Sequence, residues 1–147
     1  MDILSKLPDR LQELMLQREW TASDLAKEMR VKPSTVTRYL NGERLPSFDY
    51  FVKLLEIFDC SADFLMGLID YPPVGITYHK PPLFSERFKT LLKEYHLSQY
   101  ALHQKTKLSY DNFNKWLKGK TCPFLDNLIK LATALDCSVD YLIGRTL

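Results

Sequence analysis

Residues 20–46 read WTASDLAKEMRVKPSTVTRYLNGERLP, and the first half of this stretch predicts a short helix. Thr21 is a favourable N-cap, and Asp24, three residues later, can complete a capping box. Leu25, Ala26 and Met29 then follow at the spacing of one helical face. The pattern therefore predicts a helix of about two turns, over 22–29, that ends in a tight turn.

The second half of the stretch predicts another helix, over 33–41. Pro33 suits the first position of a helix, and Asn41-Gly42 is typical of a helix end. Its apolar residues fall on one face, whereas small polar and basic residues fall on the other. Two short helices joined by a tight turn make a helix-turn-helix, in which the polar face of the second helix can enter a DNA major groove.

The same pattern occurs a second time in the chain. A shift of 77 residues aligns 7–70 with 84–147 without a gap. The matches fall on buried-looking and helix-ending positions. Among the identical pairs are Leu25/Leu102, Leu40/Leu117, Gly42/Gly119, Pro46/Pro123, Asp59/Asp136 and Cys60/Cys137. The chain is therefore predicted to contain two copies of the same fold.

Each copy is expected to contain five helices and no strand, so the predicted fold class is all-α. In the first copy the expected helices span 5–18, 22–29, 33–41, 47–58 and 61–67. In the second copy they span 84–95, 99–105, 110–118, 124–135 and 138–144. The expected N-caps, besides Thr21, are Ser47, Ser61, Ser98 and Ser109.

The helix pattern divides the chain into a first domain at 1–69, a Pro-rich linker at 70–82 and a second domain at 83–147. Proline pairs disfavour helix at both ends of the linker. Its reach is up to roughly 43 Å at about 3.3 Å per residue, and adjacent half-sites on DNA lie about 34 Å apart. The linker can therefore let both copies touch one duplex face. Alternatively, its apolar residues pack between the copies and fix their relative angle; these are Tyr71, Val74, Ile76 and Tyr78.

The charge is distributed unevenly along the chain. The net charge is only +2, but residues 1–74 carry 9 Lys or Arg against 12 Asp or Glu, and residues 75–147 carry 11 against 6. The second half is thus expected to be the more strongly attracted to phosphate.

Composition also excludes several classes of protein. No apolar run approaches the roughly 18 residues of a membrane span, and the N-terminus has no signal-peptide apolar core. The three cysteines are not in metal-ligand spacing, which predicts reduced structural thiols in the cytoplasm. The histidines share no face with an acidic or cysteine cluster, so neither a metal nor another cofactor is expected. Because no nucleophile motif or glycine-rich phosphate loop occurs, we do not expect an enzyme.

These residues resemble the Cro/cI-type helix-turn-helix family, also called the xenobiotic-response-element family. The resemblance extends over both copies, including the closing run LDCSVDYLIGR at 135–145. It implies two tandem five-helix lambda-repressor-like domains and double-stranded DNA as the partner. Homodimerisation is possible, because family members read palindromes as dimers; no membrane partner or small-molecule ligand is evident.

The resemblance also implies which residues contact DNA, because it places the third helix of each copy in the major groove. In the first copy these residues are Lys32, Ser34, Thr35, Thr37, Arg38 and Arg44. In the second copy they are Gln99, Tyr110, Asn112, Asn114, Lys115, Lys118 and Lys120. Arg38 suits guanine or phosphate, and asparagine suits adenine. Asp111 is expected to repel phosphate unless it accepts a hydrogen bond from cytosine.

Both copies depart from the family at the turn. The usual turn glycine is replaced by Arg30 and Lys107. Either these residues adopt a less favourable backbone conformation, or the turn itself differs.

The predicted function is that of a sequence-specific, double-stranded DNA-binding transcriptional regulator. The alternative is a protein-interaction or dimerisation module that uses the same fold without binding DNA. Net charge favours the second copy as the DNA-contacting one, whereas the chemistry of the outer helix face favours the first, so which copy contacts DNA stays open.

Overall fold

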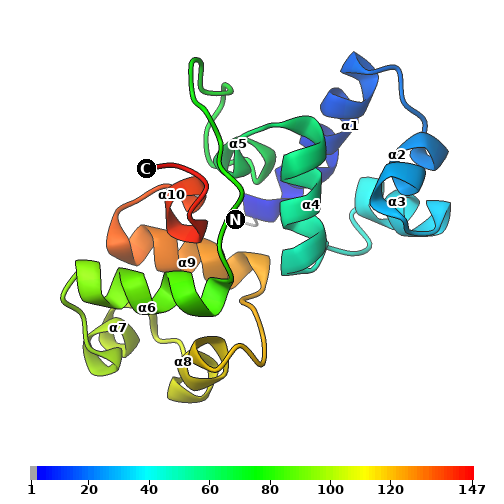
Figure 1. Cartoon of the computed structure of the whole chain (residues 1–147). Helices are drawn as coiled ribbons and strands as arrows, with labels where there is room; N and C mark the ends of the chain where they lie inside the picture. The colour runs from blue at the N-terminus through cyan, green and yellow to red at the C-terminus, as the bar shows by residue number, and fades with distance from the viewer. Residues whose placement is uncertain (1–2) are drawn as a thin grey trace. The chain divides into compact units, whose positions relative to one another are not determined.

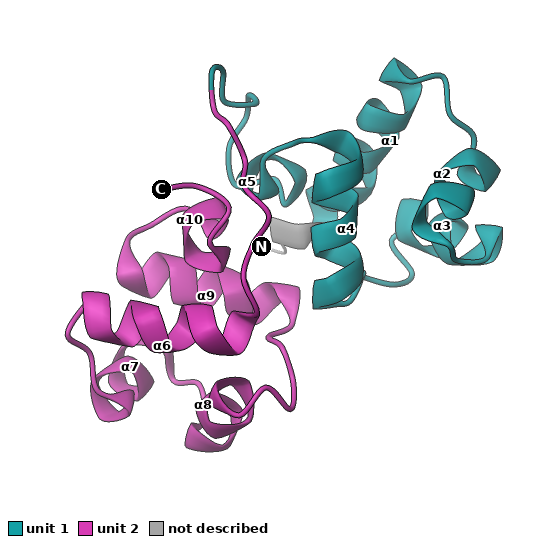
Figure 2. Ribbon diagram, viewed as in Figure 1, with its two compact units in different colours: residues 1–75 teal, residues 76–147 magenta. Residues whose placement is uncertain are grey.

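The computed structural model describes residues 3–147 (Figure 1). Within this range the chain forms ten α-helices and one short 3-10 helix and has no strand, so the all-α prediction is confirmed. The contacts divide the chain into two compact units, residues 1–75 and 76–147 (Figure 2). Each unit holds one copy of the repeat. None of the described helices has the length and apolar character needed to cross a bilayer.

The first unit begins with the 3-10 helix η1 (Ile3–Lys6) and continues with five α-helices. These are α1 (Leu7–Gln17), α2 (Ala22–Met29), α3 (Pro33–Leu40), α4 (Phe48–Phe58) and α5 (Ala62–Leu65). The first α-helix starts later than predicted because Pro8, in its first turn, has no N–H to donate. The fifth is shorter than predicted because Gly67, with φ +80°, turns the chain away.

The second unit repeats this order with α6 (Phe84–Glu94), α7 (Gln99–Thr106), α8 (Tyr110–Leu117), α9 (Leu125–Leu135) and α10 (Val139–Ile143). The predicted N-caps are confirmed. In α7 and α8, Ser98 and Ser109 accept hydrogen bonds from the backbone N–H groups of Ala101 and Asn112. Thr21 and Asp24 form the reciprocal capping box of α2. Local sequence therefore sets where most helices start.

Each unit buries its own core, which includes the apolar face of its third helix. Val36 and Tyr39 of α3 are 0 % and 1 % exposed, and Phe113 and Trp116 of α8 are 0 % and 2 % exposed. The two aromatic residues Tyr39 and Trp116 are thus core residues. Because these faces are buried, the opposite face of each third helix is turned to solvent.

An arginine in the first α-helix of each unit holds the closing helix. Arg10 donates to the carbonyl oxygen of Phe64 at 2.8 Å, and its guanidinium lies 4.1 Å from the centre of the Phe64 ring. Arg87 donates to the carbonyl oxygen of Tyr141 at 2.6 Å and lies 4.8 Å from that ring. The two pairs are equivalent under the 77-residue shift, so the repeat extends to this tertiary contact.

The predicted linker contains two different parts. Tyr71 and Val74 are 83 % and 95 % exposed. By contrast, Tyr78 lies with its ring 4.4 Å from the Arg145 guanidinium, and the N–H of His79 donates to the carbonyl oxygen of Arg145 at 2.7 Å. The end of the linker therefore packs as part of the second unit.

Candidate nucleic-acid interface

The solvent face of α3 brings together most of the residues predicted to contact DNA in the first copy. Ser34, Thr37 and Arg38 are exposed and Thr35 is half-buried. They lie opposite the buried Val36 and Tyr39, and Lys32 stands exposed directly before the helix. This gives α3 a polar, basic outer face, and a DNA major groove is wide enough to admit an α-helix.

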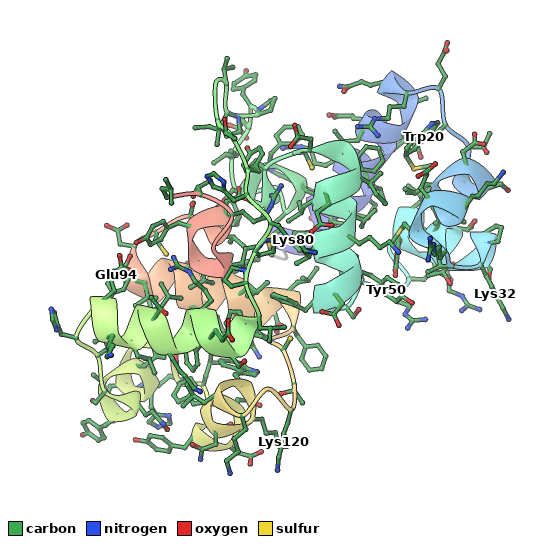
Figure 3. All side chains as sticks on the ribbon, viewed as in Figure 1. Trp20, Lys32, Tyr50, Lys80, Glu94 and Lys120 are labelled. Atoms are coloured by element: carbon green, nitrogen blue, oxygen red, sulfur yellow. The ribbon has the colours of Figure 1, made fainter. Side chains whose placement is uncertain are left out.

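No carboxylate of the described residues neutralises the cations of this face. No carboxylate among the described residues lies within 4.0 Å of the side-chain nitrogens of Lys32 or Arg38. Figure 3 shows Lys32 extending into solvent from the start of α3. The hydroxyl of Thr37 donates to the carbonyl oxygen of Pro33 at 3.1 Å, which leaves its oxygen lone pairs to accept a bond.

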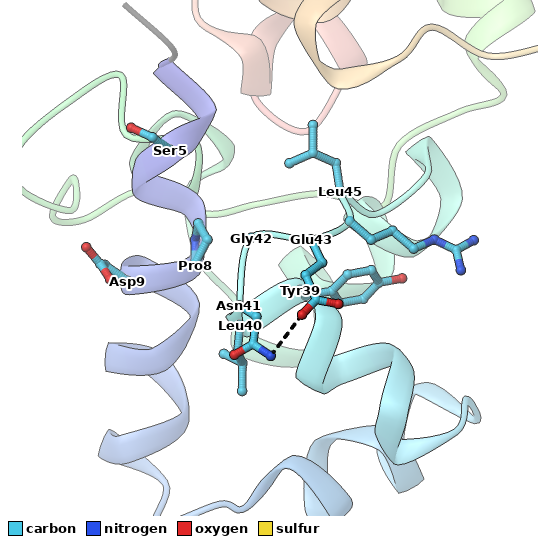
Figure 4. A pocket seen from close by; sticks show the side chains of 10 residues that line it. Ser5, Pro8, Asp9, Tyr39, Leu40, Asn41, Gly42, Glu43 and Leu45 are labelled. Atoms are coloured by element: carbon cyan, nitrogen blue, oxygen red, sulfur yellow. Dashed lines mark hydrogen bonds between the residues drawn. The ribbon is translucent and has the colours of Figure 1, made fainter.

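The chain after α3 turns sharply through Gly42, whose φ of +73° suits a residue without Cβ. An open groove of about 670 Å³ lies between this loop and the start of α1 (Figure 4). Its lining includes the acidic residues Asp9 and Glu43, and Asn41 donates to Glu43 at 3.4 Å. Arg44 also lines this groove and is exposed, and as a basic residue beside the two carboxylates it is the residue of this loop that suits phosphate.

The outer face of α8 differs from that of α3 because its cation is already paired. Lys115 lies 3.0 Å from Asp111, one helical turn away, and both side chains are exposed. Asp111, expected from the sequence to repel phosphate unless it accepts a hydrogen bond from cytosine, thus pairs with Lys115 of its own helix. The i,i+4 spacing of opposite charges is the signal that could have indicated this ion pair. The pair lowers the net charge that this face presents to DNA.

The other predicted contact residues of the second copy surround this pair. Tyr110 and Asn114 are exposed on α8, and Asn112 is half-buried. Gln99 is the half-buried first residue of α7. Lys118 and Lys120 are exposed after α8, and Figure 3 shows Lys120 extending into solvent.

The predicted charge advantage of the second copy is absent from the turn and third helix but present in the second helix, where α2 carries two acidic residues and one basic residue and α7 carries one basic residue and no acidic one. Residues 30–44 contain four basic residues and one acidic residue, and the aligned residues 107–121 contain the same numbers. Both stretches therefore carry a net charge of +3. The acidic excess of the first half therefore lies outside the turn and α3, and part of it lies on α2.

No group of three or more His, Cys, Asp or Glu side chains that could hold a metal ion occurs among the described residues. No disulfide joins the three cysteines Cys60, Cys122 and Cys137 in the described part of the chain.

Comparison with known families agrees with this geometry. Residues 11–65 match a helix-turn-helix family model, and residues 87–146 match the model of the Cro/C1-type HTH DNA-binding domain. The chain carries two tandem Cro/C1-type helix-turn-helix domains. The match covers α2 and α3 in the first unit and α7 and α8 in the second.

One curated relative is the HTH-type transcriptional regulator AnsR of Bacillus subtilis (strain 168). It is 34 % identical over 59 residues, which are 40 % of this chain and 51 % of AnsR. The chain therefore spans about half the length of this relative. No solved structure matches the chain.

The two Cro/C1-type domains differ at the turn that joins their second and third helices. Arg30 and Lys107 have φ values of 59° and 63°, which confirms the less favourable backbone conformation. In the first domain the N–H of Val31 reaches the carbonyl oxygen of Ala26 at 3.0 Å, as in a Schellman motif. In the second the N–H of Leu108 is bonded instead to the hydroxyl of Thr106 at 3.1 Å. Both alternatives left open by the missing glycine therefore occur: a left-handed residue in each turn, and two turns that differ.

Proposed function

We propose that this protein is a sequence-specific, double-stranded DNA-binding transcriptional regulator in which α3 makes the principal base contacts. The observation that carries the proposal is the contrast between Arg38 and Lys115. Arg38 is exposed with no carboxylate partner among the described residues, whereas Lys115 is paired with Asp111 at 3.0 Å. An unpaired guanidinium keeps its donor fork available for a guanine edge.

In this proposal each residue of the α3 face has a separate task. Arg38 contacts guanine through two parallel hydrogen bonds, and Ser34, Thr35 and Thr37 act as permissive donors or acceptors at neighbouring base pairs. Lys32, before the helix, binds backbone phosphate, and so does Arg44 after it; these contacts set the register of the helix in the groove.

The second domain supplies a second set of contacts. Lys118 and Lys120 flank the end of α8 and suit phosphate. Gln99 supports a backbone contact at the start of α7. Tyr110, Asn112 and Asn114 are the base-contact candidates on α8, and Lys115 joins them only if its bond to Asp111 opens.

The name of the relative AnsR supports regulation of transcription as the outcome of binding. A regulator of this kind works beside the chromosome, so we infer a cytoplasmic protein. Two domains in one chain permit two modes of binding. Either both domains bind one duplex, or one domain binds DNA and the chain forms a homodimer on a palindrome.

Selection of binding sites from a random duplex pool tests the proposal. The purified full chain is used at low and near-physiological salt, beside the variants Arg38→Ala, Lys115→Ala and Lys93→Ala. Lys93 lies in the last turn of α6, outside either helix-turn-helix, so its variant is a charge-matched control. We expect a defined motif that Arg38→Ala loses at one base pair and that Lys93→Ala keeps.

The layout of the motif reports the mode of binding. A direct repeat or two unlike half-sites indicates that both domains contact DNA, and a palindrome indicates a dimer. Absence of enrichment at low salt would contradict the proposal and favour the protein-interaction module. The exposed Tyr100 and Phe124 of the second unit would then be the first residues to test in such an interface.

A further inference from the structure

The two domains differ at two positions that lie together in the fold. Ala26 of α2 is buried at 1 % exposure, and Pro33 forms the first residue of α3. Under the 77-residue shift their equivalents are His103 of α7 and Tyr110 of α8. Where the first domain has a small alanine and a rigid proline, the second domain thus has two aromatic side chains.

The two rings contact one another across the turn. Their centres are 4.6 Å apart and their planes are inclined by 27°, which is a stacked arrangement. Nδ1 of His103 lies 2.6 Å from the carbonyl oxygen of Leu108, two residues before Tyr110. Because a carbonyl oxygen can only accept, Nδ1 carries the proton and donates. His103 therefore holds both the backbone before α8 and the side chain of its first residue.

The turn of the second domain is rearranged around this histidine. The backbone N–H of Lys107 donates to the backbone carbonyl oxygen of His103 at 2.8 Å. The helix α7 therefore ends in the single hydrogen bond of an αL motif, whereas α2 ends in the two hydrogen bonds of a Schellman motif. The hydroxyl of Thr106 donates to the carbonyl oxygen of Leu102 at 2.8 Å and accepts from the N–H of Leu108 at 3.1 Å. The end of α7 is consequently tied to the start of α8 through side chains.

Tyr110 has ring contacts with two residues but remains partly exposed. His103 covers one face, and Phe113 meets the ring edge to face at 6.2 Å and 86°. The residue is nevertheless 41 % exposed, at the end of α8 that leads into the groove in a helix-turn-helix. A ring held in one orientation loses little conformational entropy when its hydroxyl meets a base edge.

We propose that His103 is a positioning residue that orients Tyr110 for a hydrogen bond to one base pair, an inference that rests on the proposed DNA-binding function. Pro33, the equivalent of Tyr110, has no polar side-chain atom. The half-site of the second domain therefore specifies a base pair opposite the start of its recognition helix, and the half-site of the first domain does not. The two domains consequently recognise unlike half-sites.

Five variants of the full chain test this inference: Tyr110→Phe, His103→Ala, His103→Phe and the double variants His103→Ala/Tyr110→Phe and His103→Ala/Tyr110→Pro. Tyr110→Phe removes only the hydroxyl. His103→Phe keeps an aromatic ring in the stack but loses the Nδ1 bond. The variant His103→Ala/Tyr110→Pro restores the Ala/Pro pair of the first domain and is the control for folding. Site selection from a random duplex pool is the readout, and fluorescence of Trp116 in a Trp20→Phe background reports the stability of the second unit.

We expect Tyr110→Phe and His103→Ala to lose preference at the same base pair, by roughly five- to tenfold, the worth of one hydrogen bond. His103→Phe should retain part of that preference. Combining His103→Ala with Tyr110→Phe should cause no further loss. The double variant to Ala and Pro should fold, bind and be indifferent at that base pair. Nitrogen chemical shifts should assign the Nδ1–H tautomer to His103 in the free protein.

Other results would overturn the inference. A His103→Ala variant that weakens all base pairs equally has only a structural defect, and one that keeps the preference lost by Tyr110→Phe does not need the histidine. An unchanged base preference in Tyr110→Phe would show that the Tyr110 hydroxyl makes no hydrogen bond to that base pair. Absence of any enriched motif with the unmodified protein would instead contradict the proposed function, and this inference with it.

Discussion

Asp111 and Lys115 form an ion pair of 3.0 Å on the outer face of α8, where their side chains are 73 % and 47 % exposed. Exposed pairs of this kind contribute little to folding stability. The pair instead affects ligand binding, because the Asp111 carboxylate neutralises the Lys115 ammonium that would otherwise contact phosphate or guanine. The equivalent positions on α3 are Ser34 and Arg38, so the first domain lacks this carboxylate.

Replacing Asp111 by Asn should free Lys115 and strengthen DNA binding. We expect affinity to rise severalfold at low salt and the slope of log affinity against log salt to steepen by about one counterion. Fluorescence anisotropy on one duplex over a salt series measures both quantities. Asp136→Asn makes the same charge change at the far end of α9, where Asn tolerates the left-handed backbone, and should leave the slope unchanged.

Arg38→Lys should separate charge from geometry on α3. Lysine keeps the positive charge but not the planar fork, so we expect the salt slope to be retained while discrimination at one base pair falls by about 1–3 kcal/mol. Lys32→Ala should do the reverse, weakening all sequences alike and lowering the slope by about one. Competition binding with single-base-pair changes distinguishes the two. Equal behaviour of both variants would contradict the roles assigned to them.

Lys107→Gly should stabilise the second unit. Lys107 adopts φ 63°, where a side chain costs about 1–2 kcal/mol relative to the right-handed region, whereas glycine bears no such cost. The greater freedom of glycine in the unfolded chain offsets part of this gain, so we expect a net gain of about 0.5–1 kcal/mol. Chemical denaturation followed by Trp116 fluorescence in a Trp20→Phe background measures it. Lys105→Gly, inside α7, should destabilise by about 1 kcal/mol.

Arg87→Met should loosen α10 from α6. Methionine keeps much of the aliphatic packing but cannot donate to the carbonyl oxygens of Tyr141 and Leu142, which Arg87 reaches at 2.6 and 3.2 Å. Loss of charged hydrogen bonds to backbone predicts a cost of about 2–3 kcal/mol to the second unit. The same fluorescence assay measures it, and Lys89→Met on the exposed face of α6 is the control. No loss in Arg87→Met would mean that α10 is held by its apolar contacts alone.

The capping box of α2 should make the first unit sensitive to acid. The backbone N–H of Thr21, followed by its hydroxyl, donates to Asp24 and holds the pKa of that carboxyl below its ordinary value of 3.8. A lowered pKa contributes stability above the unfolded value, and the contribution disappears as pH falls through the folded value. Thermal unfolding by circular dichroism should therefore show Asp24→Asn as destabilising at pH 7, with the difference shrinking below about pH 3.8. Glu13→Gln, on the exposed face of α1, should show no such convergence.

Most of the fold was predictable because its signals are local. Thr21, Ser98 and Ser109 start helices by bonds to residues three positions on, and Gly42 ends α3 through its own backbone angle. The repeat supplied a second, independent record of the same pattern. Boundaries were missed where another local rule competed, as at Pro8, which delays α1.

The site was less predictable because its important contacts join residues of different elements. His103 stacks on Tyr110 across a turn. The sequence shows that both residues are present, but their spacing does not predict that their rings are in contact. The Asp111–Lys115 pair is the exception, since its i,i+4 spacing was visible in the sequence.

The sequence by itself determined the ten helices, their order and their division into two helix-turn-helix domains, because caps, turns and apolar periodicity act within a few residues. Only the tertiary structure decided which polar side chains remain available to a ligand. That depends on which groups pair across turns and between helices: His103 contacts the Leu108 carbonyl oxygen and the Tyr110 ring, whereas Arg38 has no carboxylate partner among the described residues.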